Sequence, residues 1–220
     1  AASNHTVKDG SAANLRYRLD DGVWRFRAGV DQSKDSGGLR DITKGHFRQL
    51  AINSRNPVRV TFREDSGPRP AVLEVFDNSN NAVNFYDPNQ YVFATANSTP
   101  RQTVDAFKSG SADLRRELRV FNVPFSLEVG GSRREQNRDI RRRNENWTYN
   151  GIGGDRAPTP FLSPVYKNQY HYYGFTNFPQ ISPKIAWEEF QKNPALFSKT
   201  AAQLRAEELF RITNSFDFRE

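Results

Sequence analysis

The chain has 220 residues, no Cys and no Met, and a formal net charge of +7 at pH 7. The absence of Cys excludes disulfide frameworks, Cys-ligated zinc, iron–sulfur clusters and thiol catalysis. No run approaches the roughly 18 apolar residues of a transmembrane helix, and no charged and apolar leader opens the chain. Because a translation product begins with Met, we expect an internal segment of a longer protein.

Only 36% of the residues are hydrophobic, whereas 13% are aromatic. This composition is too polar for a rich soluble core and too aromatic for a disordered tail. We therefore expect the apolar residues to form a thin, patterned layer. Of the 32 basic residues 24 are Arg, whose planar guanidinium group suits the recognition of phosphate or carboxylate.

The first predicted elements form a β-hairpin near the start of the chain. Strands are expected over residues 14–20 and 23–32, joined by the tight turn Asp20-Asp21-Gly22. Apolar residues alternate with charged or small ones in both strands, which predicts one apolar face and one charged face. The apolar positions are Leu15, Tyr17, Leu19, Trp24, Phe26, Ala28 and Val30.

A second hairpin of the same design is predicted about 100 residues later. Its strands cover residues 111–121 and 125–136, with a turn at Asn122-Val123-Pro124. Apolar residues again occupy one face of each strand. Arg116 falls on the apolar face, which indicates a β-bulge or a different register.

Two long connections follow the hairpins, at residues 34–110 and 137–213. The first is rich in Asn, Ser, Pro and Gly, and we expect it to be irregular apart from one smaller hairpin. The arms of that hairpin hold Val58, Val60 and Phe62 on one side of a turn from Glu64 to Pro70, and Leu73 and Val75 on the other.

The second connection is predicted to end in two helices. Ser182 as N-cap with Pro183 after it begins the first, which ends before Asn193. Thr200 and Gln203 form a capping box that begins the second, which extends to about Ile212. Alternation then resumes over residues 215–220, and we expect this strand to be interrupted by the end of the sequence.

This order predicts an all-β fold, with about five antiparallel strands of a transmembrane β-barrel and two long extracellular loops that carry short helices. Outer-membrane barrels combine short periplasmic turns, long extracellular loops and strands that are apolar toward lipid. Five strands cannot close a barrel, which needs at least about 8. Amphipathic hairpins also occur in soluble β-sandwiches, so the alternative is a soluble or secreted all-β module that binds polyanions or glycans.

Four sequence blocks resemble the barrel of TonB-dependent outer-membrane receptors of Gram-negative bacteria. They are ADLRREL at 112–118, FSLEVGG at 125–131, RDIRR at 138–142 and WTYNG at 147–151. The opening hairpin resembles an earlier pair of strands in the same barrel, whereas the two connections match only in length and composition.

The resemblance implies a longer parent with a plug domain, a TonB box and a 22-stranded barrel, none of which is complete in these residues. It implies active transport of a scarce nutrient, energised by the TonB complex. Partners would be outer-membrane lipid, lipopolysaccharide, the plug domain and remaining strands of the parent, and an unknown nutrient ligand. We expect no nucleic-acid partner and no cofactor.

The Arg-rich run after the second hairpin has three interpretations: a phosphate-binding stripe for nucleic acid, a solvated strand end, or a contact with lipopolysaccharide or loop carboxylates. The second and third are favoured. The lipopolysaccharide or loop contacts would be made by Arg138, Arg141, Arg142 and Arg143.

Aromatic residues crowd the second connection, where they either pack a small core of their own or stack on a ligand. Packing is favoured, and Trp147 and Tyr173 are the candidates if a ligand is bound. The three His are scattered, so no metal site is predicted. No nucleophile and base occur in a catalytic arrangement, and we do not expect an enzyme.

Overall fold

The computed structural model describes residues 2–63, 72–168 and 175–220. It is mostly antiparallel β-sheet, with 57% strand and 19% helix, which confirms the prediction of antiparallel β-structure. The described strands form three open sheets. The chain divides into two compact units. We call Thr6–Leu39, Arg101–Arg142 and Phe210–Glu220 the sheet unit, and Ala1–His5, Arg40–Pro100 and Arg143–Leu209 the connector unit.

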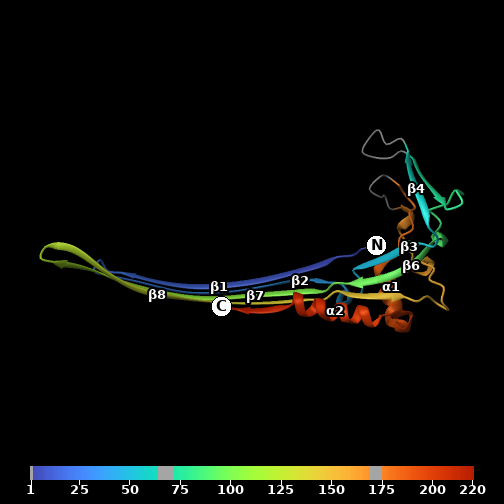
Figure 1. Ribbon diagram of the computed structural model, residues 1–220. Coiled ribbons are helices and arrows are strands. Elements are labelled where there is room, and N and C mark those ends of the chain that lie inside the picture. The colour runs from blue at the N-terminus through green and yellow to red at the C-terminus, as the bar shows by residue number, and fades with distance from the viewer. Residues whose placement is uncertain (1, 64–71, 169–174) are drawn as a thin grey trace. The chain divides into compact units, whose positions relative to one another are not determined.

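The sheet unit is a five-stranded antiparallel sheet in which spatial order follows chain order, β1-β2-β7-β8-β11. Figure 1 shows the four long strands running side by side, with the hairpin of the last two extending beyond that of the first two. The strands are β1 (His5–Asp20), β2 (Trp24–Arg40), β7 (Arg101–Val120), β8 (Val123–Arg142) and β11 (Phe216–Arg219).

The four long strands extend beyond the predicted bounds. Strands were expected over 14–20, 23–32, 111–121 and 125–136, and each continues by several residues away from its turn. The boundaries 34–110 and 137–213 of the two connections were therefore wrong, because the connections begin only after Arg40 and Arg142. The added stretches are mostly polar and show no sustained alternation of apolar residues, yet their backbones pair without interruption.

Both short turns lie at the same end of the sheet, because Trp24, which follows the first turn, pairs with Arg116 near the end of β7. Gly22 has a φ of 86°, which glycine adopts without strain. The second turn was predicted at Asn122-Val123-Pro124 but is formed by Phe121 and Asn122, with φ of 52° and 63°. Positive φ at both central residues is typical of the type I′ hairpin turn.

The register of the sheet is continuous. β7 pairs with β8 from Arg101↔Arg142 to Val120↔Val123 without a shift. Arg116 is therefore not at a bulge and does lie on the apolar face, where its guanidinium carbon is 4.7 Å from the Trp24 ring centroid. A cation over an indole ring is stabilised by the negative face of the ring, which accounts for this break in the pattern.

The connector unit contains a four-stranded antiparallel sheet in the order β10-β9-β6-β3. Two strands come from each connection: β3 (Gln49–Ser54) and β6 (Tyr91–Ser98) from the first, β9 (Glu145–Tyr149) and β10 (Phe197–Ser198) from the second. Apart from its small hairpin the first connection was expected to be irregular, which is wrong for β3 and β6. The two connections thus fold together as one body.

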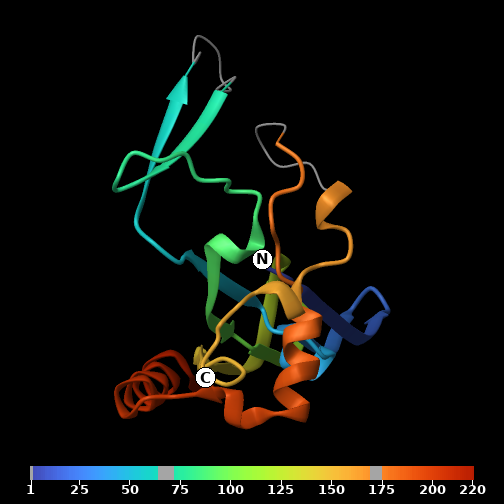
Figure 2. The same cartoon turned by 90° about the vertical axis from the view of Figure 1, so that its right-hand side faces the viewer.

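The small hairpin of the first connection is confirmed. It consists of β4 (Val58–Arg63) and β5 (Val72–Asp77), which pair with each other alone among the described strands. Figure 2 shows these two strands as a separate arm of the connector unit. The predicted turn from Glu64 to Pro70 lies outside the described residues.

The two predicted helices are also confirmed. α1 (Pro183–Lys192) begins at Ser182, whose side chain accepts a hydrogen bond from the backbone N–H of Ile185. α2 (Ala201–Asn214) begins with the expected capping box, in which the N–H of Gln203 donates to Thr200 Oγ1 and the N–H of Thr200 donates to Gln203 Oε1. No helix in the described part of the chain is long and apolar enough to cross a membrane. Short 3₁₀ helices occupy Ile42–Lys44, Pro88–Gln90, Thr159–Phe161, Tyr166–Asn168 and Pro194–Leu196.

An aromatic core fills the connector unit. Phe47 and Phe93 are fully buried, and the Phe93 ring stacks on Tyr149 with centroids 4.7 Å apart. Phe47 packs edge-on against Trp187 of α1, at 5.2 Å. Burial raises the pKa of Tyr149, so its phenol remains neutral. The cluster comprises Phe47, Leu50, Phe93, Ala96, Trp147, Tyr149, Phe161, Ile181, Ala186 and Phe197.

Candidate functional site

The sheet unit carries an uncovered apolar face. Residues directly opposite one another in an antiparallel sheet point to the same side, so the register assigns each side chain to a face. The side chains are widely exposed: Leu127 is 56%, Val129 65% and Phe121, in the turn, 98% exposed. We define the apolar face as Trp24, Phe26, Ala28 and Val30 of β2, Gly110, Ala112, Leu114, Leu118 and Val120 of β7, and Val123, Phe125, Leu127, Val129 and Gly131 of β8.

The first strand contributes to the same face. The rings of Tyr17 and Phe26 are 6.0 Å apart, which places Tyr17 beside the apolar residues of β2. A contiguous apolar surface on three or four strands is larger than the scattered exposed residues of an ordinary soluble protein, and such surfaces mark contacts with other molecules or with membranes.

The opposite face of the sheet, which we call the ion-paired face, is lined by charged side chains that pair across strands. Arg27 Nε of β2 donates to Asp113 Oδ2 of β7 at 2.8 Å, and Arg27 Nη2 is 3.6 Å from Glu128 Oε1 of β8. Nearer the turns, Arg115 is 2.8 Å from Glu117 on the same strand. The charges in this part of the face therefore compensate one another.

Asp105 anchors the ion-paired face in the half away from the turns. Gln136 Nε2 donates to its Oδ1 at 3.0 Å, and Arg138 Nε donates to its Oδ2 at 2.9 Å. These hydrogen bonds, with that from Gln136 the larger effect and that from Arg138 next, hold the pKa of Asp105 below its usual value. The β7–β8 ladder is thus reinforced by a charge-assisted side-chain network.

The four Arg residues predicted to contact lipopolysaccharide or loop carboxylates do not form one surface. Arg138 and Arg142 lie opposite Asp105 and Arg101, on the ion-paired face, whereas Arg141 lies opposite Gln102 on the other side of the sheet.

Their individual partners also differ. Arg138 pairs with Asp105, Arg141 lies 2.6 Å from Asp139, and the Nε of Arg142 is buried without a hydrogen-bond partner. Arg143 belongs to the connector unit, with a distant contact of 3.9 Å to Glu145. A run that is dense in sequence is divided because neighbouring residues of a strand alternate between faces.

Trp147, predicted as a ligand contact, is a core residue with only 8% of its surface exposed. It packs against Phe47 at 5.4 Å and Phe190 at 5.6 Å, and the ammonium of Lys199 lies 4.1 Å from its ring centroid. The favoured alternative, that the aromatics pack the loops' own core, fits Trp147 better than ligand contact. Tyr173, the second candidate, lies outside the described residues.

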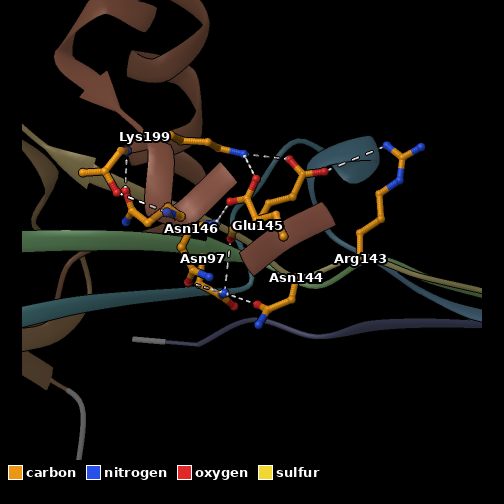
Figure 3. Close-up of polar contacts among 9 residues, drawn as sticks. Asn97, Arg143, Asn144, Glu145, Asn146 and Lys199 are labelled. Atoms are coloured by element: carbon orange, nitrogen blue, oxygen red, sulfur yellow. Dashed lines mark hydrogen bonds and ion pairs between the residues drawn. The ribbon is translucent and has the colours of Figure 1, made fainter. Parts of the chain in front are cut away.

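A polar cluster beside Trp147 joins the two connections (Figure 3). Asn97 Nδ2 of β6 donates to the side-chain oxygens of Asn144 and Asn146, both at 2.8 Å. Lys199 Nζ is 2.8 Å from Glu207 Oε2 and 3.5 Å from Glu145 Oε2. These polar groups form hydrogen bonds and ion pairs with one another, so we assign the cluster a structural role and call it the polar clamp.

Within the described ranges no group of three or more His, Asp or Glu is arranged to hold a metal ion. No known family model matches the chain, and no curated protein matches it. The structural feature that bears on function is the sheet with its two unlike faces. Sequence reasoning predicted its two-sided character but missed two ion pairs across strands. The pair Arg138–Asp105 lies within the β7–β8 hairpin and could have been inferred from the odd and even positions of the residues and the turn. The pair Arg27–Asp113 joins two different hairpins, so its register could not be inferred from a turn.

Proposed function

We propose that the chain forms part of the wall of an outer-membrane β-barrel of the TonB-dependent receptor class, which imports a nutrient. The observation that carries the proposal is the sheet unit: four long antiparallel strands, both short turns at one end, an uncovered apolar face and an ion-paired face. A barrel wall needs lipid on one side and a watery lumen on the other.

The dimensions of the apolar face support a membrane setting. On β7 it runs from Gly110 to Val120 and is interrupted by Arg116, which lies over the Trp24 ring. A rise of about 3.3 Å per residue gives roughly 33 Å along the strand, and a tilt of about 40° reduces this to a height of roughly 25 Å. The apolar band of an outer-membrane barrel is about 25 Å tall. The apolar stretch of β2 runs only from Trp24 to Val30 and is therefore shorter. Its residue nearest the turn, Trp24, pairs with Arg116 of β7.

The sheet edges also support the proposal. β11 pairs with β8 only from Asn137 to Ile140, so the remainder of that β8 edge has no strand partner in the described part of the chain. β1 is likewise an outer strand. Long unpaired edges are avoided in soluble proteins because they promote aggregation, whereas neighbouring strands of a barrel cover them.

The transport role rests on the resemblance of the four sequence blocks to TonB-dependent receptors. The connector unit supports it through the end of the sheet at which the two connections leave. Both connections leave the sheet at the end away from the short turns, which is the extracellular end of an outer-membrane barrel. In the proposed role the connector unit is the folded part that meets the ligand. The alternative, a soluble all-β module, is favoured by one observation, namely that the connector unit has a hydrophobic core.

Cell fractionation tests the proposal. We expect the protein in the outer-membrane fraction, with a gel mobility that changes on heating, as folded barrels show. Val129→Arg, on the apolar face, should reduce membrane assembly, because a cation at mid-membrane on the lipid side costs roughly 2–4 kcal/mol. Ser126→Arg, on the opposite face of the same strand, is the matched control and should assemble normally. Recovery in the soluble fraction without heat-modifiable mobility would contradict the proposal and favour the soluble module.

A further inference from the structure

Three basic side chains occupy adjacent strands at the point where the apolar face ends. They are Lys34 of β2, Lys108 of β7 and Arg133 of β8, which we call the basic row. The register places Arg133 opposite Gly110, Lys108 opposite Glu135 and Lys34 opposite Ala106, so all three lie on the same side of the sheet as the apolar face. All three side chains are exposed.

The basic row carries a surplus of positive charge. Arg133 Nη2 is 2.6 Å from Glu135 Oε1, and Glu135 lies directly opposite Lys108. Neither Lys34 nor Lys108 has an ion pair within the described ranges. Within the described ranges Arg133 is thus the only cation of the basic row that is paired with a carboxylate. This differs from the next charged residues on this side, where Arg141 and Asp139 pair one to one.

The spacing of the basic row suits a shared anion. Lys34 and Lys108 are diagonal neighbours across β2 and β7, as are Lys108 and Arg133 across β7 and β8. Diagonal neighbours lie roughly 7–8 Å apart, within reach of long side chains. Beside Arg133, small residues leave a shallow hollow in the sheet surface, lined among others by Ala28, Gly110, Ala112 and Gly131.

We infer that the basic row binds the phosphate groups of a net-anionic lipid, whose acyl chains lie on the apolar face. The inference rests on the proposed function, since it requires that this side of the sheet faces lipid. Charge complementarity favours this occupant: the apolar band ends in cations, as expected where acyl chains give way to phosphate headgroups. A soluble polyanion would not use the adjoining apolar face.

Vesicle flotation tests the inference with the whole chain. Affinity is measured for vesicles of phosphatidylcholine alone and for equimolar phosphatidylcholine and phosphatidylglycerol, and the readout is the ratio of the two. In the variant K34Q/K108Q/R133Q the preference for anionic vesicles should fall by about 100-fold, because each of the three basic residues near an anionic surface contributes roughly fivefold. Added inorganic phosphate should not displace the wild-type chain, which separates a lipid headgroup from free phosphate.

The matched control is R101Q/R134Q/R142Q, with the same charge change in the same half of the sheet but on the ion-paired face. It should keep the wild-type ratio. An equal fall in both variants, an unchanged ratio in K34Q/K108Q/R133Q, or displacement by inorganic phosphate would overturn the inference. A folding defect in K34Q/K108Q/R133Q would lower its affinity for both kinds of vesicle without changing their ratio, and this result also counts against the inference. Failure of the wild-type chain to bind either vesicle would instead contradict the proposed function.

Discussion

The two units of this chain use apolar residues in opposite ways. In the connector unit, aromatic rings from distant segments are buried against one another, and every buried hydrophobic residue described except Ile140 belongs to this unit. In the sheet unit, apolar residues alternate regularly along three strands but are exposed or only half-buried. Alternation therefore shows that a face is apolar without showing what covers it.

This difference separates two sources of stability. The connector unit is expected to be stabilised by its own packing, as in an ordinary soluble domain. Among the described residues, the sheet unit has backbone pairing and ion pairs but no buried hydrophobic cluster. Its apolar face is therefore unfavourably exposed in water, whereas lipid would cover it. Four predictions test this contrast, from the largest expected effect to the smallest.

The largest effect is expected for Phe93→Ala in the connector core. Phe93 is fully buried and contacts Tyr149 and Phe161, so its removal should destabilise the unit by about 3–5 kcal/mol. Urea unfolding in a Trp24→Phe background isolates the fluorescence of Trp147 and Trp187, both of which are in this unit. Leu127→Ala, on the exposed apolar face, is the control and should leave this transition unchanged. A shift of similar size in the urea transition of both variants would contradict the difference between a buried core and an exposed apolar face.

Removal of the shared cation in the polar clamp is expected to cost somewhat less. Lys199→Met leaves Glu145 and Glu207 together, and breaking a largely buried ion cluster costs about 3 kcal/mol. The comparison is Lys184→Met, which removes an exposed i,i+4 pair at 3.9 Å and should change stability by no more than about 0.5 kcal/mol. Equal effects measured by urea unfolding would show that the clamp is no more than a surface contact.

A smaller loss is expected at the start of α2. Thr200→Ala removes one half of the capping box and should destabilise the connector unit by about 1 kcal/mol. Gln203→Ala removes the reciprocal bond, and the double variant should lose less than the sum of the two. Strict additivity of the two losses would mean that the two hydrogen bonds are independent.

The smallest effect is expected in the sheet unit, from acid titration of Asp105. Its lowered pKa means that its contribution to β7–β8 pairing is present above the ordinary value of about 3.9 and is lost as pH falls through the lower folded value. A carboxyl-carbon NMR titration should give a midpoint below about 3.9, and Asp105→Asn should remove this acid-dependent change in the ladder. A midpoint at the ordinary value would show that Gln136 and Arg138 do not hold the carboxylate.

Local signals in the sequence predicted local structure well. The capping residues Ser182 and Thr200 begin α1 and α2 as expected, and the Asp20-Asp21-Gly22 turn joins the first hairpin. The second turn was misplaced because Pro124 suggested a turn, whereas Phe121 adopts a positive φ that no turn preference indicates. These features depend on residues close in sequence.

Long-range features were beyond such reasoning. Phe47, which immediately precedes β3, and Phe93 of β6 pack on Trp147 and Phe197 from the other connection, and no local pattern reports these contacts. The polar halves of β2 and β7 were missed because hydrophobic alternation stops where both faces become polar. The division of the Arg run was within reach, since odd and even positions of one strand face opposite sides.

Cysteine accessibility along β8 tests the central claim most directly. Because the chain has no Cys, single Cys substitutions are unique labelling sites. In envelope membranes, we expect Phe125→Cys, Leu127→Cys and Val129→Cys to react with a lipid-soluble maleimide and resist a water-soluble one. Ser126→Cys and Glu128→Cys should show the reverse. A rapid reaction of Leu127→Cys with the water-soluble reagent, equal to that of Glu128→Cys, would contradict the claim that lipid covers the apolar face.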